Sequence, residues 1–167
     1  RWTGQGLNPL AIARGSWTDP DTFYLALKGG AAELNHSHMD AGSFVYEALG
    51  VRWAIDLGMQ DYESLESKGV DLWNKTQDSQ RWRVFRLNNT AHNTLTIGGQ
   101  PHRVDGHATL RGFAGDGPAV VDLTPVFAGQ AGRVERRFDL LAGGGVKVSD
   151  DLTGVAAGTE VRWQMAT

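Results

Sequence analysis

Short apolar runs separated by glycine dominate the hydrophobic pattern of the chain. Most runs alternate between apolar and polar positions, which is the period-two pattern of a strand with one buried face. Glycine supplies 22 of the 167 residues and falls mostly between the runs, as is typical of turns. The pattern predicts strands over residues 22–28, 43–49, 51–57, 93–97, 119–123, 134–141, 146–152 and 160–165.

Two hairpins are marked, one turning near Leu49-Gly50 and one through residues 142–145. Eight or more short strands, without a repeat or a linker, predict an all-β fold. We expect one antiparallel β-sandwich domain of two packed sheets over residues 1–167. Residues 61–89 are the exception, because this polar segment fits neither strand nor turn; it is expected to be a long loop that holds a short helix.

Composition narrows the class of protein. With 41% hydrophobic residues, six Trp and six Phe, the chain can fill the core of one domain. A net charge of −3 and a pI near 5.9 argue against a nucleic-acid or anionic-membrane binder. No run approaches the roughly 20 apolar residues of a membrane span. The lack of cysteine excludes disulfides and thiolate ligands, and it fits the cytoplasm or a bacterial periplasm.

The two ends of the sequence suggest a piece of a longer protein. The first residues lack both a starting Met and a signal-peptide pattern, and the last ones stop inside an alternating, strand-like run. We therefore expect a fragment of a larger protein.

Histidines and acidic residues alternate in one short segment. If it is extended, His36, His38 and Asp40 emerge on one face, about 6–7 Å apart per pair. The hairpin at Leu49-Gly50, with a two-residue turn, places Asp56 opposite Ser43 and so returns a carboxylate toward the histidines.

A second imidazole is expected from His92, which directly precedes the predicted strand over residues 93–97 and could approach from a neighbouring strand. Two imidazoles and a carboxylate suit Zn²⁺ or another borderline divalent ion, with waters completing the shell. Each residue alone is weak evidence, since an isolated His is usually a surface or hydrogen-bonded core residue. Their clustering is what favours a metal site.

The remaining charged residues are weaker candidates. Arg81 and Arg86 lie among Trp82 and Phe85, a pattern that fits either a cationic, aromatic lining for acidic sugars or a solvated edge strand. Two other groups are predicted to be solvated surface. They are His102 and His107 beside a turn, and Arg133, Arg136 and Arg137, which Glu135 and Asp139 would neutralise.

Three motifs carry a resemblance to a known family: NHSHMDAGSF at residues 35–44, WAIDLG at 53–58 and AHNT at 91–94. With RGSW at 14–17 leading to YLA at 24–26, they resemble the heparinase II/III family over about residues 10–100. Beyond that range the chain shows only generic β-structure. The family joins a helical α/α-toroid to a C-terminal antiparallel β-sandwich, and it cleaves uronic-acid polysaccharides such as heparan sulfate or alginate by elimination. Only the sandwich half is expected here.

Carried over by motif position, the resemblance implies that His38, Asp56 and His92 are metal ligands, with zinc the expected ion. It also implies that His36 is a catalytic histidine facing the substrate cleft, while Asp40 receives no role. A Tyr and an Asn or His from the helical half complete the family's site. The fragment alone is therefore expected to be inactive, with an acidic polysaccharide and the N-terminal helical domain as its partners. The family habit also implies a bacterial periplasmic or secreted location.

Two other classes compete with the lyase. A non-catalytic carbohydrate-binding sandwich would stack its aromatic residues on sugar rings. A cupin-like metalloenzyme also uses His-x-His on a β-scaffold, and Gly30 followed by His36 reproduces the start of its pattern. The continuation fails, because a cupin needs a Glu four or five residues after the second His and the nearest one is Glu47.

Overall fold

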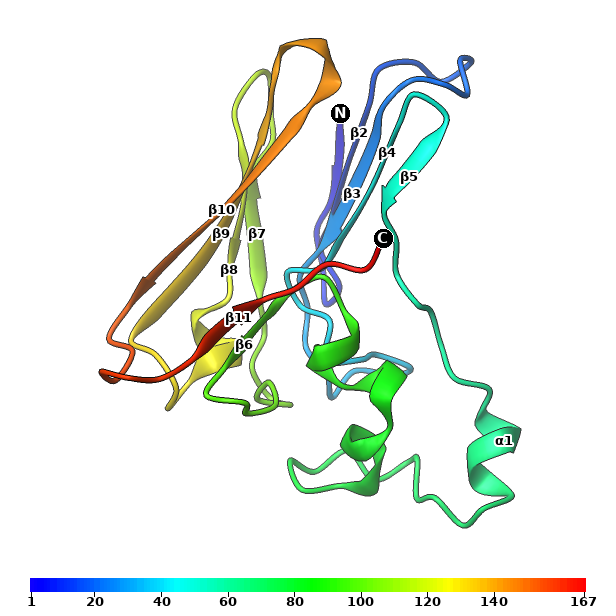
Figure 1. Cartoon of the computed structure of the whole chain (residues 1–167), viewed down its shortest axis with the longest axis vertical. Coiled ribbons are helices and arrows are strands. Elements are labelled where there is room, and N and C mark those ends of the chain that lie inside the picture. The colour runs from blue at the N-terminus through cyan, green and yellow to red at the C-terminus, as the bar shows by residue number, and fades with distance from the viewer.

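Two antiparallel sheets pack face to face in the computed structural model, which describes residues 1–167 (Figure 1). The five-stranded sheet has the order β1-β2-β3-β4-β5, and the four-stranded sheet the order β10-β9-β8-β7. A short two-stranded ribbon pairs β11 with β6. The predicted all-β sandwich is confirmed.

The strands are short, as the pattern predicted. The first sheet contains β1 (Trp2–Gly4), β2 (Leu10–Arg14), β3 (Tyr24–Lys28), β4 (Phe44–Ala48) and β5 (Val51–Ala54). The second contains β7 (Thr109–Gly112), β8 (Ala119–Asp122), β9 (Arg133–Leu140) and β10 (Val146–Thr153). The ribbon consists of β6 (Leu95–Ile97) and β11 (Val161–Trp163).

Three strands escaped the sequence prediction: β1, β2 and β7. None is longer than five residues, and β1 and β7 each end in glycine, which reads as a turn when the partner strand is unknown. Pairing of β1 with β2, of β2 with β3 and of β7 with β8 extends them nonetheless. Non-local hydrogen bonding therefore overrides a weak local signal.

Alternating residues of both sheets form one core between them. Leu25 and Leu27 of β3 are buried, and Phe44 of β4 meets Phe138 of β9 edge to face at 5.5 Å between ring centroids. The cluster contains 19 buried residues, and most come from alternate positions of strands. Burial of one face of each sheet therefore holds the two layers together.

Both predicted hairpins are present. The β4–β5 turn places Leu49 and Gly50 at φ of 57° and 70°, the two positive values of a type I′ turn. The register begins as predicted, with Ala48 facing Val51, but a bulge between the pairings of Glu47 and Tyr46 shifts it, and β5 ends at Ala54. The expected pairing of Asp56 with Ser43 is therefore wrong.

The long segment over residues 61–89 contains a short helix, as predicted. This helix, α1 (Tyr62–Glu66), begins after Asp61, whose carboxylate accepts a hydrogen bond from the Ser64 amide. Three 3₁₀ turns follow, η1 (Gln80–Arg83), η2 (Phe85–Leu87) and η3 (Asn89–Ala91). Together they lie at one end of the sandwich (Figure 1).

Two further 3₁₀ turns occur outside this segment. One is η4 (Thr124–Phe127), between β8 and β9, and the other is η5 (Ala142–Gly144), in the β9–β10 hairpin. None of the helices has the length and apolar character that crossing a membrane requires.

Candidate metal centre and its surroundings

Two imidazoles and two carboxylates gather at the end of the sandwich next to the long segment. The ligand atoms of His38, Asp40 and His92 all lie within 4.8 Å of one another. Asp56 joins them through its Oδ2 atom, which lies 2.7 Å from Nδ1 of His92. Of the three residues predicted as metal ligands, His38 and His92 therefore lie together and Asp56 reaches the cluster through His92, while Asp40 is the carboxylate close to both imidazoles.

The loop between β3 and β4 positions His38 and Asp40. Met39, between them, is buried in a small cluster with Trp82, and its amide donates to the carbonyl of Leu87. Because the middle residue is anchored on both its backbone and its side chain, its two polar neighbours are fixed outside the cluster. The loop is a series of turns with His36 at φ 58°, so the extended conformation expected for this segment is wrong.

His92 follows η3 and is fully buried. Its Nδ1 atom meets Asp56, while its Nε2 atom is buried without any hydrogen-bond partner. A buried polar nitrogen without a partner is costly unless something else occupies its lone pair or proton. The cluster therefore contains a buried imidazole nitrogen that no group of the protein satisfies.

The protonation of the cluster suits a cation. Burial lowers the pKa of His38 to about 4, against the opposing charge of Asp40, so its imidazole is neutral at pH 7. Burial works to raise the pKa of Asp56, but the hydrogen bond and charge of His92 outweigh it and hold this pKa below its usual value. A neutral imidazole and an ionised carboxylate are the forms in which these groups bind metals.

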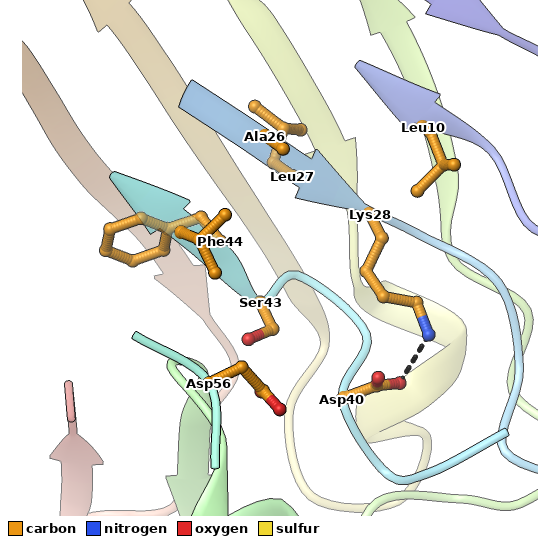
Figure 2. A pocket seen from close by; sticks show the side chains of 9 residues that line it. Leu10, Ala26, Leu27, Lys28, Asp40, Ser43, Phe44 and Asp56 are labelled. Carbon is orange, nitrogen blue, oxygen red and sulfur yellow. Dashed lines mark hydrogen bonds and ion pairs between the residues drawn. The ribbon is translucent and has the colours of Figure 1, made fainter. Parts of the chain in front are cut away.

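Asp40 differs from Asp56 in its charge partner. The ammonium of Lys28, the last residue of β3, lies 2.6 Å from Oδ1 of Asp40, and both side chains are largely buried (Figure 2). The pair ties the loop to the sheet, which gives Asp40 the role that the sequence did not supply. It also neutralises Asp40, whereas Asp56 has no Lys or Arg partner and is bonded by the imidazole of His92 and the amide of Gly58.

A pocket of about 180 Å³ opens beside the two carboxylates. Figure 2 shows Asp56 and Ser43 on one side of it and the Lys28–Asp40 pair on the other. Its floor comes from apolar residues of the five-stranded sheet, Leu10, Ala26, Leu27, Phe44 and Val45. The two carboxylates are therefore reachable from outside the sandwich.

His36 lies outside the cluster. Its exposed ring stacks almost parallel on Tyr62 of α1 at 6.1 Å between centroids and meets Trp73 edge to face at 6.0 Å. The long segment thus supplies an aromatic frame for this histidine. Its predicted catalytic role stays a prediction.

The two arginines predicted to bind substrate lie in different environments. Arg81 is buried, and its guanidinium donates to the carbonyls of Leu72 and Ser37, so it braces the loop next to His38 and is not placed to meet a sugar. Arg86 is exposed and donates to the carbonyl of Leu57, directly after Asp56. Of the two, only Arg86 is a solvent-exposed cation near the centre.

Two residues assigned to the solvated surface are buried. His102 donates from Nε2 to the Leu95 carbonyl, packs against Phe127 and has its pKa lowered to about 4 by burial. Arg136 is also buried. Its position gave a signal that was overlooked, because it alternates with Val134 and Phe138 on the core-facing side of β9.

The other members of these two groups are nearer to the prediction. Arg137 pairs with Asp139 on the surface, and Arg133 pairs with Glu135. His107 is partly buried, with Nε2 at 2.9 Å from the Leu7 carbonyl.

The antiparallel sandwich therefore gathers two imidazoles and two carboxylates where loops of the five-stranded sheet meet the segment that leads into β6. Residues 11–167 match the family model described as heparinase II/III-like, C-terminal, so the chain belongs to this family. The match confirms the resemblance found in residues 10–100 and extends it to the end of the chain. A comparison with curated proteins found no match.

Proposed function

We propose that the chain is the β-domain of a polysaccharide lyase that cleaves uronic-acid polysaccharides, of the heparan sulfate or alginate type, by β-elimination. The observation that carries the proposal is the cluster of His38, Asp40 and His92, with Asp56 bonded to His92, in a member of the heparinase II/III-like family. Family membership also favours this reading over a cupin-like enzyme. An exported, periplasmic or secreted enzyme is part of the proposal, because its polymeric substrate lies outside the cell.

His38, Asp56 and His92 are the proposed ligands of one divalent ion, with zinc the ion that fits this donor set best. The buried Nε2 of His92 without a partner supports the fit. Asp56 is preferred to Asp40 as the carboxylate ligand, because Lys28 already neutralises Asp40 at 2.6 Å. When bound, the ion would supply positive charge that cross-links the three loops.

Elimination from a uronate sets three demands on the enzyme. The substrate carboxylate must be neutralised, the proton alpha to it removed, and the departing glycosidic oxygen protonated. His36, exposed and framed by Tyr62 and Trp73, is the proposed proton carrier, and Arg86 is the proposed partner of a substrate anion. Two side chains cannot meet all three demands, so the isolated chain is proposed to be inactive until another part of the enzyme completes the site.

A non-catalytic sugar-binding role is the second candidate. The exposed tryptophans favour it, since Trp17 is 71% exposed and Trp53 50% exposed, and exposed indole rings are common stacking platforms for sugars. Such a module would bind acidic or neutral glycans without changing them.

The two functions are separated by one assay on the natural full-length protein. It is incubated with alginate, heparan sulfate, hyaluronan and chondroitin while ultraviolet absorbance is followed, because elimination creates an absorbing unsaturated uronate. We expect a rise with at least one polymer, and its loss in His36→Ala. Binding without any absorbance rise on all four polymers would instead support the sugar-binding module.

A further inference from the structure

Arg136 and Asp150 form a buried ion pair in the four-stranded sheet, which supplies none of the proposed ligands. They face each other across the β9–β10 pairing, and the guanidinium meets the carboxylate through two bonds of 2.7 and 3.0 Å. The side chain of Arg136 is fully buried and that of Asp150 is 10% exposed. The pair thus has the bidentate geometry of a strong, directional contact.

The same guanidinium reaches across the sandwich to two of the ligand-bearing loops. Its Nη1 atom donates to the carbonyl of Gly42 at 3.0 Å and to the carbonyl of Asn93 at 2.8 Å. Gly42 lies two residues after Asp40, at the end of the loop that carries His38, and Asn93 directly follows His92. One side chain therefore fixes the separation of the segments that hold the two imidazoles.

Asn93 extends this network to the third ligand. Its Nδ2 atom donates to the carbonyls of Phe44 and Ile55, each at 2.7 Å, and Ile55 directly precedes Asp56. Its Oδ1 atom accepts the amide of Ala166, so all the hydrogen-bonding atoms of its side chain are used. Arg136 and Asn93 together contact a backbone group within four residues of every proposed ligand.

Stability alone is a poor explanation for this arrangement. Desolvating two charges offsets most of their attraction, and apolar side chains of similar size often replace a buried ion pair without loss. Val134 and Phe138, on either side of Arg136 on the same face of β9, are such apolar residues. What an apolar residue cannot do is donate to two loop carbonyls at once.

We propose that Arg136, held by Asp150 and acting with Asn93, is a positioning residue that sets the spacing of the metal-ligand loops, so that metal affinity depends on the four-stranded sheet. The inference rests on the proposed metal site. It assigns no contact between Arg136 and the metal itself.

The test compares zinc binding by the wild-type chain, Arg136→Lys and Arg137→Lys. Lysine keeps the charge at position 136 but lacks the planar fork that spans Asp150 and both carbonyls. Arg137 is the matched control, because it is the next residue of β9 and its pair with Asp139 lies on the surface. Zinc affinity is measured by competition with a chromophoric chelator, and the cobalt-loaded proteins give an absorption spectrum that reports ligand geometry.

We expect Arg136→Lys to weaken zinc binding about 10–100-fold, the usual effect of removing an outer-shell partner, and to change the cobalt spectrum. Arg137→Lys should match the wild type in both. Affinity is calculated per folded molecule from circular dichroism, so a loss of stability alone does not imitate the effect. If Arg136→Lys does not fold, Asp150→Asn carries the test, with a smaller loss of affinity expected because the two loop carbonyls keep their donor.

Two results overturn the inference and can be told apart. A folded Arg136→Lys or Asp150→Asn protein with wild-type zinc affinity and an unchanged cobalt spectrum would show that the pair is only structural, and it would leave the metal site standing. A wild-type chain that binds neither ion would remove the proposed metal site and the inference with it.

Discussion

The two sheets of the sandwich share one core but contribute differently to the candidate centre. The five-stranded sheet supplies most of it, because the loop after β3 carries His38 and Asp40, and the chain leaving β5 carries Asp56; only His92 comes from elsewhere, the segment before β6. The four-stranded sheet contributes no candidate ligand, yet its Arg136 bonds the carbonyl of Gly42, 94 residues earlier in the chain. The candidate ligands of the five-stranded sheet and the arginine that bonds their loop therefore belong to different layers.

Neighbouring arginines on β9 provide the strongest test of that contrast. Arg136→Ala leaves Asp150 buried and unpaired, so we expect the free energy of unfolding to fall by roughly 3–5 kcal/mol. Arg137→Ala removes only a surface pair and should leave the free energy of unfolding almost unchanged. Urea unfolding of both metal-free variants measures the difference, and equal losses would contradict the contrast.

The second prediction concerns the loss of stability in acid that buried His102 should cause. Burial lowers the pKa of His102 from 6.5 to about 4, so between these values the unfolded state binds a proton that the folded state does not. The free energy of unfolding should therefore have its full value above pH 6.5 and decrease as the pH falls toward 4. This residue accounts for a decrease of about 3 kcal/mol.

His102→Gln is the variant for this measurement, since its amide can still donate to the Leu95 carbonyl. Urea unfolding at pH 7 and pH 5 with a metal chelator should show a flatter pH dependence in the variant than in the wild type. Parallel pH dependences would mean that His102 is not buried in its neutral form.

The smallest effect concerns the two carboxylates of the centre. Lys28→Met removes the cation 2.6 Å from Asp40, so the local potential becomes more negative. We expect zinc affinity to rise several-fold and stability to fall by about 1 kcal/mol. Zinc titration of Lys28→Met checks this, and weaker binding would show that Lys28 orders the loop more than it repels the ion.

The sequence predicted much of the fold because most strands are amphipathic, as in β3, where Leu25 and Leu27 are buried and Ala26 and Lys28 face outward. It also predicted that His38, Asp56 and His92 would meet. The predicted pairing of Asp56 with Ser43 was wrong, because a bulge that no local sequence pattern indicates changed the hairpin register.

The errors at the site come from side chains whose environment is set far away in the sequence. Arg81 was expected to line a sugar site or a solvated edge strand, and Arg136 was assigned to the surface. Instead, the carbonyls of Ser37 and Asn93 and the carboxylate of Asp150 bind these two side chains inside the domain. Burial of a charged residue depends on partners that are distant in the sequence, so residue type alone misleads. The alternation of Arg136 with Val134 and Phe138 was the available clue.

Metal content tests the central claim most directly. The purified wild-type chain and the double variant His38→Ala/His92→Ala are dialysed against zinc and then against metal-free buffer, and their zinc is quantified by elemental analysis. The account predicts about one equivalent in the wild type and none in the folded double variant. One equivalent retained by the double variant, or none in the wild type, would contradict it.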